Sequence, residues 1–141
     1  MIGASPRRKE DQRLLTGGGR FLDDLTREGL LHLGVVRSVE AHARLAKVAT
    51  EAARHFPGVV LVWSASDLGE IAPHVPTAYG GAHKGRPWAQ PVLARDVVRY
   101  VGEPVAVVVA EDLARLADAL DTVIIEYERL PALPTAEAAL A

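Results

Sequence analysis

The clearest secondary-structure signals lie between Val101 and Leu133, in the stretch VGEPVAVVVAEDLARLADALDTVIIEYERLPAL. Val105–Ala110 is apolar throughout, which is typical of a strand covered on both faces. Asp112 is a suitable helix cap, and apolar residues after it recur at helical spacing, at Leu113, Leu116, Ala117 and Leu120. The stretch therefore predicts a central strand followed by an amphipathic helix.

The segment after this helix is expected to be another strand. Thr122–Glu128 carries apolar side chains at alternate positions, and two prolines end it, at Pro131 and Pro134. A strand–helix–strand unit normally forms a right-handed crossover between parallel strands, so we expect a parallel pair here. A charge at Val107 is expected to prevent folding, because it would bury an unpaired carboxylate in the central strand.

Weaker patterns on the N-terminal side predict further elements. The expected strands are Leu30–Arg37, Ala43–Ala49, Val59–Trp63 and Val97–Val101, and Val59–Trp63 is apolar on both faces. A short helix over Glu51–Phe56, capped by Thr50, is expected to end at Pro57-Gly58, and another to cover Thr135–Leu140. Ala43–Trp63 is a candidate for a second strand–helix–strand unit.

Together these segments predict an α/β (α+β) fold, with a mixed sheet and packed helices in one domain over residues 27–134. Residues 1–26 are polar, charged and glycine-bearing, with a turn at Gly17-Gly18-Gly19, so we expect an extended N-terminal arm. Gly69–Gln90 is rich in proline and glycine and predicts a long loop. Residues 135–141 are expected to form a C-terminal tail or the start of a linker.

Composition excludes several classes of protein. The 141 residues carry a formal net charge of −2, which gives no field to attract nucleic acid, and the short Arg7-Arg8-Lys9 cluster is best interpreted as a solvated arm. The absence of cysteine excludes disulfides, thiolate-zinc sites, iron–sulfur clusters and cysteine nucleophiles within this chain. No apolar run is long enough to span a bilayer, and the first residues lack the apolar core of a signal peptide. We therefore expect a cytoplasmic protein.

The residues alone predict no catalytic, cofactor-binding or metal site. The histidines never stand at the close spacing of a local ligand pair, lying at His32, His42, His55, His74 and His83. A hydrolase triad has its residue types in Ser64, Ser66, Asp67 and His74, but no nucleophile elbow is present and a cap followed by a loop is favoured. The glycines before Arg20 lack the Lys-Ser/Thr of a phosphate-binding loop, which favours a turn.

Five residues are candidates for an interface or cleft: Arg20, His42, Arg44, Gly102 and Glu103. His42 and Arg44 flank the start of a strand, where they can bind a partner's carboxylate or phosphate or, more commonly, bond to their own loop. Glu103 stands between a glycine and a proline at a strand break. Its two alternatives are to line a cleft or to cap a backbone group, and capping is the commoner.

A set of short motifs runs in order along almost the whole chain, from Ile2 to about Pro134. The motifs are Ile2-Gly3, Pro6-Arg7, Glu10-Asp11, Arg13–Gly17, Gly19-Arg20-Phe21, Asp23-Asp24, Val36-Arg37-Ser38, Ala41–Arg44, Phe56–Val59, Arg99–Ala106, Glu126-Tyr127-Glu128 and Leu130-Pro131. Each is weak alone, but their collinearity is specific. On these motifs the chain resembles the N-terminal α/β hammerhead domain of molybdenum hydroxylase large subunits, the family of xanthine dehydrogenase, aldehyde oxidase and carbon monoxide dehydrogenase.

The resemblance implies a role within a larger enzyme. Large subunits of this family carry molybdopterin, and they hydroxylate aldehydes or heterocycles with oxygen from water, or oxidise carbon monoxide. Their electrons leave through iron–sulfur clusters, usually to FAD, in other domains or subunits. The cofactor-binding loops and the catalytic glutamate lie in later domains, so the resemblance assigns no catalytic, cofactor or metal ligand to this chain and implies no cofactor bound by it alone.

Two functions of different class follow. The first is a structural component of a molybdenum-dependent oxidoreductase, inactive alone, whose partners are the molybdopterin-binding domains or subunit and the iron–sulfur and flavin subunits. Because family large subunits are several times longer, the chain is expected to be a split subunit, an isolated domain or a truncated product. The second is a stand-alone binding module on the same scaffold. An independent hydrolase lacks a convergent nucleophile and base.

Overall fold

The computed structural model describes residues 3, 5, 7–69, 74–75 and 90–140. The chain divides into two compact units, Met1–Leu30 and Leu31–Ala141. Most of the loop expected over Gly69–Gln90, including His83, lies outside the described residues. None of the helices in the described ranges combines the length and apolar character that a membrane crossing requires.

The first unit contains two short helical segments. Helix α1 covers Asp11–Leu15, and a 3₁₀ turn covers Leu22–Asp24; neither has a buried residue. The Thr16 hydroxyl donates to the Gln12 carbonyl oxygen at 2.7 Å, and the Phe21 amide donates to Asp24 Oδ2 at 2.9 Å. Gly17 has φ +73°, which confirms the turn predicted there. Local hydrogen bonds hold this unit, and none of its described residues is buried.

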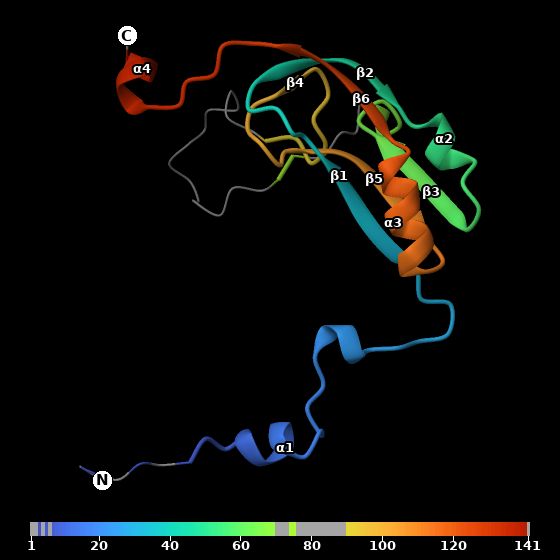
Figure 1. The fold of residues 1–141 in the computed structure, drawn as a ribbon, viewed down its shortest axis with the longest axis vertical. Helices are drawn as coiled ribbons and strands as arrows, with labels where there is room; N and C mark the ends of the chain where they lie inside the picture. The colour runs from blue at the N-terminus through green and yellow to red at the C-terminus, as the bar shows by residue number, and fades with distance from the viewer. Residues whose placement is uncertain (1–2, 4, 6, 70–73, 76–89, 141) are drawn as a thin grey trace. The chain divides into compact units, whose positions relative to one another are not determined.

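The second unit contains two three-stranded antiparallel sheets (Figure 1). The first has the order β1-β5-β3, and its strands are His32–Arg37, Pro104–Ala110 and Val59–Ser64. The second has the order β4-β2-β6, and its strands are Val97–Val98, Ala43–Ala49 and Ile124–Arg129. The helices of this unit are α2, α3 and α4, at Glu51–Arg54, Leu113–Asp121 and Ala136–Leu140. Successive strands alternate between the two sheets along the chain.

The α/β class and the central position of β5 are confirmed, but the predicted parallel pairing is wrong. Strand β6 follows β5 and α3, yet it pairs antiparallel with β2 in the other sheet. Both edges of β5 are already taken, by β1 and β3, so β6 has no free edge beside it. Ala43–Trp63 is not a crossover unit either, because β2 and β3 belong to different sheets. The described strands form two antiparallel sheets, whereas one mixed sheet was expected.

Helix α3 begins where predicted, but its buried stripe differs. The Asp112 carboxylate accepts a hydrogen bond from the Arg115 amide at 2.8 Å, as an N-cap should. Leu116 and Ala119 are the buried residues, whereas the predicted Leu113 and Ala117 are exposed. The buried face includes Leu116 and Leu120, which reach strand β1 at Gly34; a Cβ built there would stand 2.7 Å from Leu120 Cδ1. The missing side chain on β1 therefore lets the helix lie close to the sheet.

The structure also corrects the predicted ends of β4 and α2 and the predicted burial of β3. Strand β4 stops at Val98, three residues before the expected end, because the next amide, that of Arg99, donates to the Glu103 carboxylate instead of to a strand. Helix α2 ends at Arg54, two residues early, and Thr50 does not cap it: the Thr50 hydroxyl instead accepts from Arg54 Nε at 3.1 Å. Strand β3 is apolar as predicted but is not covered on both faces, since Val60 is 54% and Trp63 43% exposed.

The core is built from two clusters that meet along β5. One lies between the first sheet and the helices and consists of Ala53, Val62, Val108, Ala110, Leu116 and Ala119. The other lies against the second sheet and consists of Ala43, Ala94, Val98 and Val105. Val108 and Ala110 of β5 thus face the helices, while Val105 faces the second sheet. Apolar residues on both faces of β5 hold the two layers together.

Candidate functional site

The loop between β4 and β5 is a closed turn built around Glu103, whose side chain is 0% exposed. Its carboxylate accepts a hydrogen bond from the Arg99 amide at 2.5 Å and one from Arg99 Nη1 at 3.1 Å. Gly102 has φ +91°, a conformation that favours glycine, and this allows the chain to reverse before Pro104. Glu103 therefore caps the backbone of its own turn, and its carboxylate is enclosed.

The same turn is joined to the end of β1. The Gly102 amide donates to the Ser38 carbonyl oxygen at 2.8 Å, and the Ser38 amide donates to the Glu103 carbonyl oxygen at 2.9 Å. Arg37 Nη1 donates to the Gly102 carbonyl oxygen at 2.9 Å. These bonds tie the start of β5 to its sheet partner β1 at the junction of the two sheets, and they fix the turn as a rigid corner.

His42 and Arg44 lie at the start of β2, in the second sheet. His42 Nδ1 lies 2.6 Å from the Pro131 carbonyl oxygen, so its ring is bonded to the segment after β6. Arg44 is exposed and stands opposite Glu128 in the register of β2 and β6. Ala43, between His42 and Arg44 in the chain, pairs with Val98 of β4, which shortly precedes the Glu103 turn. The structure thus brings His42, Arg44, Gly102 and Glu103 to one end of the second unit, whereas Arg20 belongs to the first unit.

The hydroxyl and carboxylate groups after β3 form a closed cap. Ser64 Oγ donates to Asp67 Oδ2 at 2.8 Å, and the Ser64 amide donates to the same oxygen at 2.7 Å. Arg54 Nη2 donates to Asp67 Oδ1 at 2.7 Å. Ser64 thus contacts a carboxylate and Ser66 rather than a histidine base, which agrees with the predicted cap rather than a triad.

Burial acts to raise the pKa of Asp67, but hydrogen bonds from Ser64 and Arg54 outweigh it and hold that pKa below the usual value of 3.8. A carboxyl with a depressed pKa stabilises the fold above its unfolded pKa of about 3.9, and this contribution disappears as the pH falls through the folded pKa. We expect Asp67→Asn to lower the free energy of unfolding by about 1–2 kcal/mol at pH 7.

Urea unfolding at pH 7 and pH 3 measures this effect. The two proteins are expected to differ most at pH 7 and to differ less at pH 3, because the contribution of the carboxylate declines as the pH falls below its unfolded pKa of about 3.9. Ser66→Ala is the control, since Ser66 contacts only the Ser64 hydroxyl in this cap. An Asp67→Asn deficit of equal size at both pH values would show that the charge of Asp67 is not its stabilising property.

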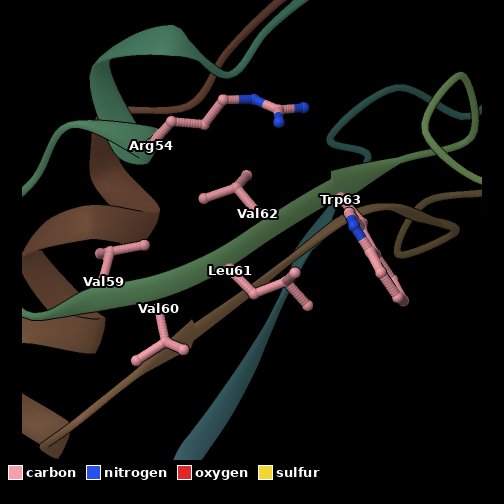
Figure 2. Close-up of a pocket in the computed structure, with 6 residues that line it drawn as sticks. All are labelled: Arg54, Val59, Val60, Leu61, Val62 and Trp63. Carbon is pink, nitrogen blue, oxygen red and sulfur yellow. The ribbon is translucent and has the colours of Figure 1, made fainter.

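Sequence reasoning missed an apolar surface on the first sheet. We define the open sheet face as the side of this sheet away from α3, formed by Leu33, Val35, Leu61, Trp63, Val107 and Val109. A hollow of about 210 Å³ runs along the outer edge of β3 beside it, lined by Arg54 and Val59–Trp63. In Figure 2, Val59 and Val62 point to the side of Arg54, whereas Val60, Leu61 and Trp63 point to the other side. The signal was present in the doubly apolar pattern of Val59–Trp63.

Nearly the whole chain matches one protein family. Residues 16–131 match the family described as aldehyde oxidase and xanthine dehydrogenase, a/b hammerhead domain. The nicotine 6-hydroxylase large subunit of Paenarthrobacter nicotinovorans is 45% identical over 130 residues, which are 92% of this chain and 16% of that protein. The carbon monoxide dehydrogenase large chain of Hydrogenophaga pseudoflava is 37% identical over 134 residues, with coverages of 93% and 16%.

The fold agrees with these relatives. The crystal structure of quinoline 2-oxidoreductase from Pseudomonas putida 86 superposes with a TM-score of 0.83 at 44% identity, and the match covers 99% of this chain and 18% of that one. The chain therefore spans about one sixth of the length of these relatives and corresponds to one segment of their large subunits. The chain belongs to the family of aldehyde oxidase and xanthine dehydrogenase α/β hammerhead domains.

Proposed function

We propose that this chain is a structural domain, or a small split subunit, of a molybdenum-cofactor-dependent oxidoreductase of the aldehyde, xanthine or carbon monoxide dehydrogenase type, without activity alone. The observation that carries the proposal is that nearly the whole chain matches the same small segment of several larger oxidoreductase subunits. In this proposal residues 27–134 are the hammerhead domain, residues 1–26 an arm and residues 135–141 a tail or linker.

The described residues offer no arrangement typical of a molybdopterin or metal site. In the described ranges no group of three histidine, aspartate or glutamate side chains lies together in a way that suits a metal ion. Every enclosed side-chain nitrogen or oxygen there already has a hydrogen-bond partner, so none is left to receive a cofactor. The proposal therefore assigns no reaction step to this chain and places molybdopterin, iron–sulfur clusters and FAD in partner domains or subunits.

The exposed candidates are proposed to contact those partners. Arg44 presents a charged group at the start of β2, and Arg20 does so in the first unit, while His42 and Glu103 hold their own loops in shape. Gly102 contributes through the backbone of the rigid turn. We propose a cytoplasmic location for the assembled enzyme, as the sequence predicts.

The test is to purify the tagged chain from its native host and to assay molybdenum and iron in the proteins that co-elute. Both metals, in a complex with larger subunits, would support the proposal. A metal-free chain that elutes alone would contradict it and would favour the alternative of a stand-alone binding module on this scaffold.

We propose further that the N-terminal arm docks on a partner. Its exposed side chains include several large apolar groups, namely Leu15, Phe21, Leu22 and Leu25, although its sequence is polar overall. We expect trypsin to cleave the arm of the isolated chain rapidly, at Arg13 or Arg20, and much more slowly in the complex. The control is cleavage at Arg115, within α3, whose rate in the isolated chain is limited by unfolding of the second unit. Equal cleavage of the arm in both samples would contradict docking.

A further inference from the structure

We propose that the open sheet face is the surface on which this domain packs against the remainder of a molybdenum hydroxylase large subunit. This inference rests on the proposed function and deepens it, because it names the contact surface. Two adjacent cross-strand rows make the face. Leu33, Val109 and Leu61 form one row across β1, β5 and β3, and Val35, Val107 and Trp63 form the next.

The opposite side of this sheet is already covered. Gly34, Val108 and Val62 form a row that lies under α3, where Val62 and Val108 join the buried cluster around Leu116. On the open side, only the start of β5 is covered, where Val105 packs with Ala43 and Val98 of the second sheet. The rest of that side has no covering layer among the described residues. Within the part of the chain that the structure describes, the open sheet face is therefore the uncovered side of the first sheet.

Exposure identifies which side chains remain available. Leu33 on β1 is 62% and Trp63 on β3 43% exposed, and the other four residues of the face are half-buried. All six are apolar, and Figure 2 shows Leu61 and Trp63 on the side away from Arg54. A sheet that is apolar on both faces normally lies between two layers, and this one has a layer on one face only.

The second sheet provides a contrast within the same molecule. Its exposed positions include Arg44 and Lys47 on β2 and Glu126 and Glu128 on β6, and Lys47 Nζ lies 3.9 Å from Glu126 Oε1. Charged cross-strand neighbours of this kind suit contact with water. Both sheets are antiparallel and three-stranded, so the apolar character of the open sheet face is a property of its sequence rather than of its architecture.

The length of the relatives indicates what covers the face. Their matches include 92% to 99% of this chain, yet more than four fifths of each relative lies outside the matched segment. In those subunits the hammerhead segment is therefore accompanied by a much larger amount of polypeptide. A contiguous apolar surface is typical of an interaction site, and permanent interfaces are the more apolar ones. The occupant we propose is that remaining part of the large subunit, with an apolar contact surface of its own.

To test this inference, the tagged chain is purified from its native host with the proteins that bind it. The yield of these proteins is then compared between two substitutions. Leu33→Asp places a charge on the open sheet face, and Leu113→Asp places the same charge on α3, at a leucine that is 65% exposed. We expect Leu33→Asp to lower the yield of co-eluting molybdenum-containing protein at least tenfold and Leu113→Asp to leave it within twofold. Trp63→Ser, from β3, is a second and milder probe of the same face. Thermal unfolding first establishes that each variant is folded.

The outcomes separate this inference from the proposed function. The wild type and the folded Leu33→Asp and Trp63→Ser variants could capture equal amounts of molybdenum-containing protein. That result would overturn the proposed interface and leave the proposed function intact. A wild type that captures no molybdenum-containing protein would overturn both. Recovery of a second copy of this chain as the sole partner, lost in Leu33→Asp, would also overturn the proposal, because the face would then be a self-association surface.

Discussion

Val108→Asp is expected to abolish cooperative folding of the second unit. Val108 is fully buried in the central strand, between Gly34 and Val62 and beneath α3. An unpaired carboxylate at this position costs several kcal/mol, which is a large part of the roughly 5–15 kcal/mol that stabilises a typical domain. Loss of the thermal unfolding transition in circular dichroism measures the effect.

The neighbouring residue supplies the control. Val107 is half-buried on the open sheet face, so Val107→Asp is expected to lower the melting temperature but to leave a cooperative transition. The sequence predicts that a charge at Val107 prevents folding. The structure assigns this effect to Val108 instead, because Val108 is fully buried under the helix and Val107 is only half-buried. Equal loss of structure in both variants, or an unchanged melting curve for Val108→Asp, would show that burial does not decide the outcome.

Glu103→Ala is expected to lower the free energy of unfolding by about 2–4 kcal/mol. The substitution removes the acceptor for the Arg99 amide and leaves a cavity at a side chain that is 0% exposed. The turn then loses the carboxylate that caps the Arg99 amide and pairs with the Arg99 guanidinium. Urea unfolding of the wild type and the variant at pH 7 measures the difference.

Glu111→Ala is the matched control for Glu103→Ala. Glu111 also pairs with an arginine four residues along the chain, Arg115, at 2.9 Å, but both side chains are about half exposed. Surface pairs of this kind contribute about 0–1 kcal/mol, so a small effect is expected. Comparable losses in the two variants would mean that the ion pair, rather than the buried cap, is what Glu103 contributes.

Local signals in the sequence predicted local structure well. The central strand, the Asp112 cap and the glycine turn at Gly17 follow from side-chain chemistry within a few residues, and the structure confirms each. The pairing of β6 with β2 does not follow from such signals, because it depends on which strand edges remain free after β1 and β3 have joined β5. A strand–helix–strand pattern looks the same in either arrangement.

For the candidate site too, the sequence indicated local features but not the contacts between distant parts of the chain. Polar residues near strand ends were recognisable as candidates, but the sequence does not show that the Glu103 side chain is enclosed or that His42 contacts the Pro131 carbonyl. The open sheet face was missed because an apolar strand with one uncovered side has the same composition as one covered on both. Only the position of α3 over Gly34 distinguishes the two faces of that sheet.

The alternation of successive strands between the two sheets determines when the fold can form. Strands β1 and β3 have no hydrogen bonds to each other, and the first sheet exists only once Pro104–Ala110 has entered between them. During synthesis the first hundred residues therefore lack β5, the strand whose Val108 buries Val62 in the core. The first sheet forms only through contacts between distant parts of the chain, and contacts of this kind slow folding.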